Sequence, residues 1–338
     1  MSGPIRAGVC GVGHLGRIHA RIYSELRDTE LVCVVDPDEV RGRAVAAEFG
    51  TEWASDAERL ADRVDVVSVA TPTVRHAETA LPLLEAGVSC LVEKPFAASL
   101  EEADRMMAAA GDSGARLAVG HVERFNPVIS VVRDLDSAPR FVEVHRLAPF
   151  SFRSVDVGVV LDLMIHDLDI LLAVIDSPIE TVDAVGGSIL TRSEDMVSAR
   201  LRFANGCVAN LTASRVSLEP MRRIRIFSSE SYVSLDFHKR YALCVRKGPR
   251  WDDSAVARLA ESPPALADGD ASVFGDLLEV QEMEIPDHEP LVEEIRSFAA
   301  AVRDGTPMIV GATAGRAALE AALRVREALD ESTWKPGP

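Results

Sequence analysis

The sequence lacks paired cysteines, an excess of positive charge and any long uninterrupted run of apolar residues. Its five cysteines lie far apart and include no C-x-x-C pair, so they favour neither a disulfide framework nor a zinc cluster. We therefore expect no metal and a reducing, cytoplasmic location. Lys and Arg number 36 against 53 Asp and Glu, and this net charge of −17 argues against nucleic acid or an anionic membrane as a partner.

Apolar segments are too short or too interrupted for a membrane span or a signal peptide. The most apolar stretch, Val157–Ile175, contains three aspartates and a histidine, so it falls short of the roughly 18 uninterrupted apolar residues that suggest a span. The first residues reach glycines before an apolar signal core could form. At 338 residues, 47% apolar and 26% charged, the chain has the composition of a folded protein of one or two domains.

The first 120 residues alternate short β-type runs with helical patterns. Strands are expected at Ile5–Cys10, Leu31–Val35, Val64–Val69, Ser89–Val92 and Arg116–Val119. Helices are expected at Leu15–Leu26, Asp38–Phe49, Thr73–Ala86 and Leu100–Ala110. This alternation predicts parallel βαβ units, and hence an N-terminal doubly wound parallel sheet of the α/β class.

The pattern changes after about residue 120. Asn126–Leu135, Val157–Ile175 and Pro290–Ala328 have helical spacing, and Trp251–Gly275 has the composition of a loop. Strands are expected at Thr181–Leu190, Met196–Phe203, Cys207–Arg215, Met221–Phe227, Tyr232–Asp236 and Tyr241–Arg246. We therefore predict a second, α+β domain with a mainly antiparallel sheet, over residues 122–338, with C-terminal helices at 290–330, after a dinucleotide-binding domain at 1–121.

A glycine-rich loop follows the first expected strand. Its G-x-G-x-x-G motif consists of Gly11, Gly13 and Gly16, with His14 and Leu15 between the last two glycines. Between a strand and a helix, such a loop lets backbone N–H groups approach a pyrophosphate at the positive end of the helix. A glycine-rich turn that binds nothing is the alternative. The position after a strand and before a helix favours the dinucleotide site.

Asp36 ends the second expected strand, 20 residues beyond Gly16. A carboxylate at this point can accept hydrogen bonds from the adenosine ribose hydroxyls. We therefore predict NAD as the cofactor. NADP is the alternative, because Arg41 and Arg43 follow closely and could pair with a 2′-phosphate.

Polar residues of a second candidate site lie on an expected strand end and an expected helix. Lys94 follows the strand Ser89–Val92, at the sheet edge where open α/β folds bind ligands. Asp162, His166 and Asp169, spaced by four and three, form one stripe on a helix that is apolar almost all round. Unpartnered polar groups in a buried helix cost several kcal/mol, so the stripe favours a functional role. A structural carboxylate–histidine pair, or a stripe that meets solvent, is the alternative.

Taken together, the motifs resemble the glucose–fructose oxidoreductase, inositol dehydrogenase and rhizopine catabolism (Gfo/Idh/MocA) family over nearly the whole chain. The matching elements are Gly11–Gly16 with His19 and Ala20, Asp36, Ala70-Thr71-Pro72 with His76, Glu93-Lys94-Pro95, Gly120-His121, Arg124–Pro127, Asp162-x-x-x-His166 and Glu289-Pro290-Leu291. The E-K-P and D-x-x-x-H motifs are specific in combination. Met164 is a departure, since many members have glycine there.

The resemblance implies roles for individual residues. Lys94, Asp162 and His166 would form the catalytic set. Thr71, Pro72, His76 and Glu93 would lie near the cofactor, with Thr71 and Pro72 toward the nicotinamide. The resemblance also implies an open-faced sheet in the second domain that forms a homo-oligomer, a dimer or a tetramer.

A narrower resemblance concerns the substrate. The runs Gly120–Pro127, Asp162–Asp169, Asn205–Arg215 and Arg222–Phe227 look like the branch of UDP-N-acetylglucosamine 3-dehydrogenases, which oxidise the sugar 3-hydroxyl to a ketone on the way to a modified lipid A. Substrate-binding residues would be Lys94, His121, Arg124, Asn126, Asp162, His166 and Arg215. Arg215, Arg222, Arg223 and Arg225 could meet a diphosphate, or they could occupy the polar face of a strand beside acidic neighbours.

These residues predict an oxidoreductase that transfers a hydride from a sugar carbon to NAD. His166, whose side chain titrates near pH 6.5 when unperturbed, is the expected general base, while Asp162 orients the site and Lys94 donates to the reacting oxygen. The alternatives are a dehydrogenase of a free polyol such as inositol, and a catalytically silent nucleotide-sensing protein.

Positive and negative charges are unevenly distributed along the chain. Residues 200–250 contain 11 Lys and Arg with 3 Asp and Glu, whereas residues 251–304 contain 3 Lys and Arg with 14 Asp and Glu.

Overall fold

The computed structural model describes residues 3–132, 138–151, 157–249 and 277–330, together with residues 251, 252, 254, 257 and 261. The chain forms two compact units. The first comprises Met1–Asn126, Leu168–Ile170 and His288–Leu323, and the second Pro127–Asp167, Leu171–Asp287 and Arg324–Pro338. Segments distant in the sequence therefore contribute to each unit.

The first unit contains a six-stranded parallel sheet, as the strand and helix alternation predicts. The strands are β1 (Ile5–Cys10), β2 (Thr29–Val35), β3 (Glu52–Ala54), β4 (Val66–Val69), β5 (Ser89–Glu93) and β6 (Leu117–Gly120). Their order is β3-β2-β1-β4-β5-β6, and all five pairings are parallel. This is the doubly wound order of a Rossmann fold, whose ligands lie at the carboxyl ends of the strands. Only the three-residue β3 was not expected.

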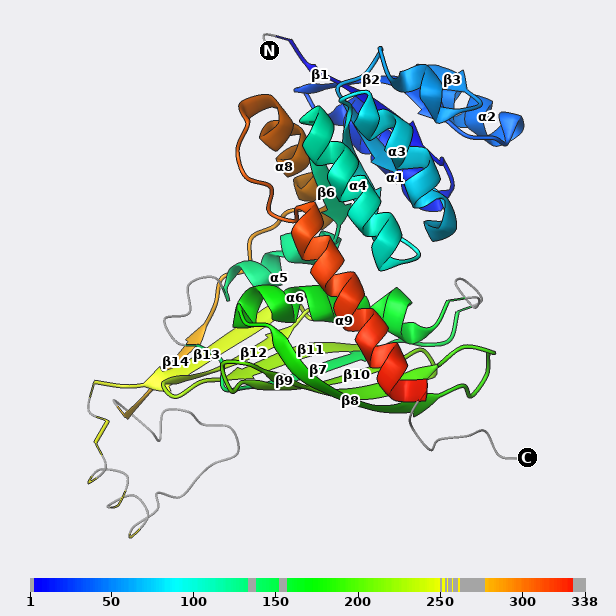
Figure 1. Ribbon diagram of the computed structural model, residues 1–338. Helices are drawn as coiled ribbons and strands as arrows, with labels where there is room; N and C mark the ends of the chain where they lie inside the picture. The colour runs from blue at the N-terminus through cyan, green and yellow to red at the C-terminus, as the bar shows by residue number, and fades with distance from the viewer. Residues whose placement is uncertain are drawn as a thin grey trace. The chain divides into compact units, whose positions relative to one another are not determined.

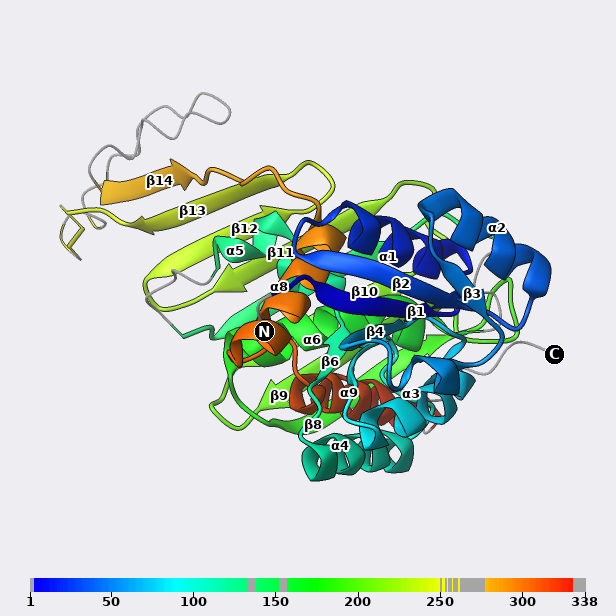
Figure 2. The same ribbon diagram turned by 90° about the horizontal axis from the view of Figure 1, so that it is seen from above.

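Helices cover both faces of this sheet. They are α1 (His14–Glu25), α2 (Glu39–Phe49), α3 (His76–Glu85) and α4 (Leu100–Ser113), with 3₁₀ turns η1 (Ala57–Leu60), η2 (Thr73–Arg75) and η3 (Val122–Phe125). Figure 2 shows α1 and α2 on one side of β1 and β2, and α3 and α4 on the other. The predicted helices therefore exist, with ends shifted by a few residues.

Helix α8 (Pro290–Asp304) also belongs to the first unit. Its apolar face buries Ile295 and Phe298 in the same core as Ile5 and Val9 of β1. The contacts thus differ from the expected division, which assigns residues 290–330 to the second domain. An amphipathic helix joins the core that accepts its apolar face, whatever its place in the sequence. Helix α9 (Ala312–Asp330) continues from the first unit into the second.

The second unit is built on an eight-stranded sheet in the order β14-β13-β12-β11-β7-β10-β9-β8. The strands are β7 (Phe141–Leu147), β8 (Ile179–Gly187), β9 (Met196–Phe203), β10 (Val208–Ser214), β11 (Met221–Phe227), β12 (Ser231–Asp236), β13 (Tyr241–Lys247) and β14 (Leu278–Glu282). Every pairing is antiparallel except that of β7 with β10. The mainly antiparallel sheet is confirmed.

Several expected boundaries in this unit were wrong. Strands β7 and β14 were not expected, and β8 ends at Gly187, so residues 188–190 form a turn instead of the end of the strand. The expected helix Asn126–Leu135 is reduced to α5 (Pro127–Ser130), and its last residues lie outside the described residues. Most of the expected loop Trp251–Gly275 also lies outside them.

The expected helix Val157–Ile175 consists of a π-helical turn, η4 (Val160–Met164), followed by α6 (Ile165–Ile175). Asp167 of α6 accepts two hydrogen bonds from the guanidinium of Arg146 on β7, at 2.7 and 2.6 Å, and both side chains are buried. This pair fixes α6 against one face of the sheet, and no helix of the described residues covers the opposite face (Figure 1). In the part of the chain that the structure describes, no helix has the length and apolar character of a membrane span.

We predict that Asp167→Asn destabilises the protein by about 3 kcal/mol, because Arg146 is then left as a buried charge without its carboxylate. Urea denaturation measures this loss. Asp112→Asn, at an exposed position near the end of α4, is the control and should stay within about 0.5 kcal/mol of the parent protein. A loss below about 1 kcal/mol for Asp167→Asn would contradict a stabilising role of the pair.

Candidate active site

The glycine-rich loop joins β1 to α1 and is closed tightly against its neighbours. Gly11 has a φ of +83°, a conformation that favours glycine. A Cβ atom on Gly16 would lie 1.8 Å from the carbonyl oxygen of Gly11, so no side chain fits there. Gly13, by contrast, has no atom within 4 Å of the position of a Cβ. The loop therefore forms a cradle that stays open at Gly13, where backbone must approach a pyrophosphate.

Asp36 lies directly beside this loop, as the sequence predicts. Its buried carboxylate accepts hydrogen bonds from the backbone N–H groups of Val12 and Asp38, each at 2.9 Å. It also accepts two hydrogen bonds from Arg41, at 3.0 and 2.7 Å. Burial opposes its charge, but the hydrogen bonds from Arg41 and the two backbone groups outweigh burial and lower the pKa of Asp36. Asp36 is thus held as a carboxylate beside the glycine-rich loop, where the sequence predicts contact with a ribose.

The strand end after β4 supplies a second part of this edge. The hydroxyl Oγ1 of Thr71 is buried and has no hydrogen-bond partner among the described residues, so it can serve a ligand. His76 is buried, with Nε2 2.9 Å from the carbonyl oxygen of Thr71 and Nδ1 3.0 Å from that of Pro95. Burial lowers its pKa. His76 therefore joins the two loops that flank the expected nicotinamide end, and Pro72 lies exposed beside Thr71.

Glu93 is the end of a buried polar chain that sequence reasoning missed. Its Oε1 lies 3.1 Å from Nε2 of His19 on α1, and Nδ1 of His19 lies 3.0 Å from the Ser68 hydroxyl, which also contacts the Tyr23 hydroxyl at 3.0 Å. The other carboxylate oxygen of Glu93 accepts a hydrogen bond from the backbone N–H of Lys94 at 3.2 Å. This chain fixes Glu93 and the backbone of half-buried Lys94. The signal was present in the sequence, because His19, Gly16 and Tyr23 share the inner face of α1.

The predicted substrate residues His121, Arg124 and Asn126 lie in and around the short turn η3. His121 is buried, and burial together with the charges of Lys94 and Arg124 lowers its pKa to about 3, so it is neutral at physiological pH. Arg124 donates to Asp169 at 3.4 Å, and Asn126 donates to Glu123 at 3.2 Å. The structure thus brings His121 close to both Lys94 and Arg124.

Two carboxyl groups of the first unit are buried with few or no donors. Glu294 of α8 is 2% exposed, and neither of its carboxyl oxygens has a hydrogen-bond partner among the described residues. Burial, together with the charges of Glu93 and Asp169, raises its pKa well above the usual range. Burial likewise raises the pKa of Asp169 to about 7, because its single contact with Arg124 compensates only in part. Glu294 therefore holds its proton more tightly than an exposed glutamate does.

Asp162 and His166 belong to the second unit. Asp162 lies in η4 and His166 in the first turn of α6, and both are half-buried, whereas Met164 and Ile165 between them are fully buried. Both polar side chains are therefore partly exposed, and their joint action stays a prediction. Asp169, the third member of the expected stripe, is instead buried and accepts a hydrogen bond from Arg124. Both of these residues belong to the first unit.

The arginines of residues 215–225 are engaged within the second unit. Arg223 donates to Asp236 at 2.8 Å and Arg225 to Glu143 at 3.1 Å. Alternation along β11 places Arg222 on the face opposite to these two, with its guanidinium over the ring of Phe237. The three arginines of β11 therefore cannot meet one diphosphate, and the alternative of a polar strand face with acidic partners accounts for Arg223 and Arg225. Arg215 is buried and donates to the carbonyl oxygen of Val157.

Family models cover both units. Residues 5–121 match the oxidoreductase family with an NAD-binding Rossmann fold, and residues 139–234 match the Gfo/Idh/MocA C-terminal domain. The chain belongs to the Gfo/Idh/MocA family of oxidoreductases. It therefore has the fold of an NAD-binding dehydrogenase, and the resemblance inferred from the motifs is confirmed.

Individual relatives span nearly the whole chain. The UDP-N-acetylglucosamine 3-dehydrogenase of Acidithiobacillus ferrooxidans is 38% identical over 96% of this chain and 97% of its own length. A solved structure of that enzyme superposes with a TM-score of 0.85 over 97% of this chain and 98% of its own. An inositol 2-dehydrogenase of Rhizobium meliloti is 26% identical over 95% of this chain and 96% of its own length. The inositol enzyme is thus the more distant of the two.

We predict that Gly13→Ala and Gly16→Ala separate cofactor binding from folding. Gly13→Ala should keep the melting temperature and weaken NADH binding at least about tenfold, because its methyl group meets only the incoming pyrophosphate. Gly16→Ala should lose both, since its methyl group overlaps the loop itself. Fluorescence titration with NADH and thermal melting measure the two effects. Gly111→Ala on α4, with open space around it, is the control, and unchanged NADH binding by Gly13→Ala would refute the cradle.

Asp169 should make stability depend on pH. Its pKa of about 7 in the folded state lies above the unfolded value near 3.9, so the folded state binds the proton more tightly and loses stability as pH rises from about 4 to about 7. The stability of the parent protein relative to Asp169→Asn should therefore fall over this window, by on the order of 4 kcal/mol, and level off above it. Urea denaturation at each pH measures the difference. A constant difference would mean that Asp169 stays ionised.

Proposed function

We propose that this chain catalyses the NAD-dependent oxidation of the 3-hydroxyl of a UDP-N-acetylglucosamine-type nucleotide sugar to a ketone. The observation that carries the proposal is the 38% identity with a UDP-N-acetylglucosamine 3-dehydrogenase along nearly the full length of both chains. A match of this extent includes the strand ends, η4 and α6 that hold the candidate residues. The product would be a substrate for amination in the formation of a modified lipid A.

NAD is the proposed cofactor. The cradle closed by Gly16 and the unpartnered hydroxyl of Thr71 fit a dinucleotide with its pyrophosphate at the start of α1. Asp36 supports NAD over NADP, because a carboxylate accepts from ribose hydroxyls and repels a 2′-phosphate. Arg41 is held by Asp36 and is therefore not free to serve a phosphate while that pair persists. Bound NAD would supply the acceptor for the hydride.

Residues of the protein would accept the proton of the substrate hydroxyl and stabilise the negative charge that develops on its oxygen. His166 would take the hydroxyl proton as the carbon–hydrogen bond breaks and the carbonyl forms, since imidazole titrates near working pH. Lys94 would donate a hydrogen bond to the same oxygen as it gains negative charge. Asp162, four residues before His166 and likewise half-buried, would orient the imidazole. His121, Arg124, Asn126 and Arg215 are the further residues proposed to contact substrate.

A homo-oligomer in the cytoplasm is the proposed working form. The sheet face opposite α6 carries the half-exposed side chains of Glu143, His145 and Asn210, with Arg200 donating to Asn210 at 3.0 Å. A broad face of this kind, bare of helices in the described residues, suits a second copy of the same chain. Five cysteine thiols without disulfides and a dinucleotide cofactor fit a reducing compartment.

A free polyol is the second candidate substrate, because inositol 2-dehydrogenases are also full-length relatives. A catalytically silent nucleotide sensor is disfavoured by the presence of Lys94, Asp162 and His166 together. Both alternatives make distinct predictions, since only the proposed function requires a nucleotide diphosphate on the substrate.

We expect NADH to form when the purified protein is mixed with NAD and UDP-N-acetylglucosamine. Little NADH should form with NAD and myo-inositol, and NADPH should form more slowly when NADP replaces NAD. His166→Ala and Lys94→Ala should each lower kcat roughly 10²- to 10⁴-fold, because each removes a group that acts on the reacting oxygen. Absorbance of NADH measures turnover, and mass spectrometry identifies the keto product.

Binding of NADH is the control in these variants and should stay near that of the parent protein. Turnover with myo-inositol alone would replace the substrate. Near-normal rates in both variants would refute the proposed roles of Lys94 and His166, and cofactor binding without turnover across sugars and sugar nucleotides would support the sensor.

A further inference from the structure

The helix that carries Asp162 and His166 begins without a side-chain cap of its own. Val159, which precedes η4, offers no polar group to the free N–H groups of the first turn. Backbone N–H groups at the helix start instead donate hydrogen bonds to Glu194, which is distant in the sequence. The backbone N–H of Val159 donates to the Glu194 carbonyl at 3.0 Å, and that of Val160 donates to the Glu194 carboxylate at 3.4 Å.

Glu194 fits closely against the residue before the helix. A Cβ atom on Gly158 would lie 1.9 Å from a carboxylate oxygen of Glu194, so only glycine leaves room for this contact. The carbonyl oxygen of Gly158 in turn accepts the backbone N–H of Asp162 at 3.0 Å. The position of Asp162 is therefore tied, through Gly158, to the position of Glu194.

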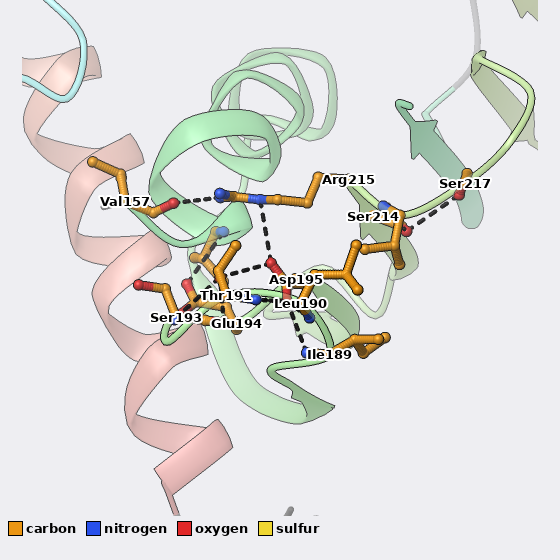
Figure 3. A network of polar contacts seen from close by, with 12 residues as sticks. Val157, Ile189, Leu190, Thr191, Ser193, Glu194, Asp195, Ser214, Arg215 and Ser217 are labelled. Atoms are coloured by element: carbon orange, nitrogen blue, oxygen red, sulfur yellow. Dashed lines mark hydrogen bonds and ion pairs between the residues drawn. The ribbon is translucent and has the colours of Figure 1, made fainter. Parts of the chain in front are cut away.

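Asp195, the next residue, organises the turn that presents Glu194 (Figure 3). One oxygen of its buried carboxylate accepts three successive backbone N–H groups, those of Ile189, Leu190 and Thr191, at 2.7, 2.6 and 2.8 Å. The other oxygen accepts the Thr191 hydroxyl at 2.8 Å. Burial opposes the charge, but these bonds outweigh it and lower the pKa of Asp195. The three N–H groups thus already donate to Asp195 and are not available to a ligand.

Arg215 links the same carboxylate to the chain just before the helix. Its backbone N–H donates to the Asp195 carbonyl at 2.9 Å, and its Nε lies 3.8 Å from Oδ1 of Asp195. Its guanidinium also donates to the carbonyl oxygen of Val157, as Figure 3 shows. Two independent connections, through Glu194 and through Arg215, therefore run from Asp195 to residues 157–160.

We propose that Asp195 is a positioning residue for Asp162 and His166. Its carboxylate holds the turn 188–195 and Arg215, which together fix the start of η4, and η4 carries Asp162. π-helical turns occur frequently at functional sites. A displacement of about 1 Å in a reacting group can cost about 10²-fold in rate, so a fixed helix start acts on kcat. This proposal rests on the proposed function, because it gives Asp195 its effect through those two residues.

The test uses the full-length protein and three variants of the turn. Asp195→Asn removes the charge and weakens the three N–H contacts. Thr191→Val removes the hydroxyl, with its contacts to Asp195 and Ser193, at nearly constant shape, and Thr191→Ser restores it. Asp236→Asn is the matched control, since Asp236 is also buried, accepts two backbone N–H groups and pairs with an arginine, Arg223, but joins β11 to β12.

Hydrogen–deuterium exchange of a peptide covering residues 157–165 is the first readout. Asp195→Asn and Thr191→Val should exchange faster there, while Thr191→Ser and Asp236→Asn match the parent protein. The second readout is turnover: kcat should fall about ten- to hundredfold in Asp195→Asn and less in Thr191→Val, with KM and NADH binding little changed. Asp236→Asn should lower the melting temperature without lowering kcat at a temperature where it is folded.

Unchanged exchange in Asp195→Asn and Thr191→Val would overturn the proposal, as would faster exchange with an unchanged kcat. If Asp195→Asn does not fold, Thr191→Val with its Thr191→Ser rescue decides the question. Turnover by the parent protein separates the two proposals. If it does not oxidise UDP-N-acetylglucosamine, the proposed function fails, whereas the exchange of residues 157–165 still reports whether Asp195 fixes the helix start.

Discussion

A carboxylate that is buried away from water needs hydrogen-bond donors from the protein, and this constraint organises both units of the chain. Asp36 finds its donors in the glycine-rich loop and Arg41, so the end of β2 and the start of α1 are held together. Asp167 finds them in Arg146, so α6 is held on the sheet. Asp195 finds them in the turn that precedes it. In each case the donor set is what brings a candidate functional segment into place.

The exceptions to this constraint lie together in the first unit. Glu294 and Asp169 are buried, but neither has enough donors for two charged oxygens. Burial raises the pKa of each, and the charge of Asp169 raises the pKa of Glu294 further. The raised pKa of Glu294 favours its neutral form, which does not need donors for two charged oxygens. Glu93 differs because His19 and the backbone of Lys94 supply donors to both of its oxygens. Of Glu93, Asp169 and Glu294, only Glu93 has a hydrogen-bond partner for each carboxylate oxygen among the described residues. Glu93 therefore stabilises the end of β5, which Lys94 follows.

The sequence was sufficient where the contacts are local. The strand and helix alternation, the cradle of Gly11 to Gly16 and the nearby Asp36 were all predicted, because each depends on patterns within a few tens of residues. Strand β7 was missed although Val142 and Val144 alternate with polar residues, which is a readable strand signal. The donors of Glu194 lie 34 residues away, and α8 joins a core formed by the other end of the chain. Such contacts follow from the topology, which the local pattern does not contain.

Charge illustrates the same distinction. The excess of 11 Lys and Arg over 3 Asp and Glu in residues 200–250 suggested a field for an anionic substrate. In the folded sheet, Arg223 and Arg225 are matched by Asp236 and Glu143, and Arg222 lies on the other face. Positive charge in this segment therefore stabilises the sheet's own carboxylates. The proposed pyrophosphate site uses no net charge, because it consists of backbone N–H groups at the start of α1. The attraction of these groups and of the helix dipole for an anion is local to the first turn of the helix. It can therefore operate in a protein whose net charge is −17.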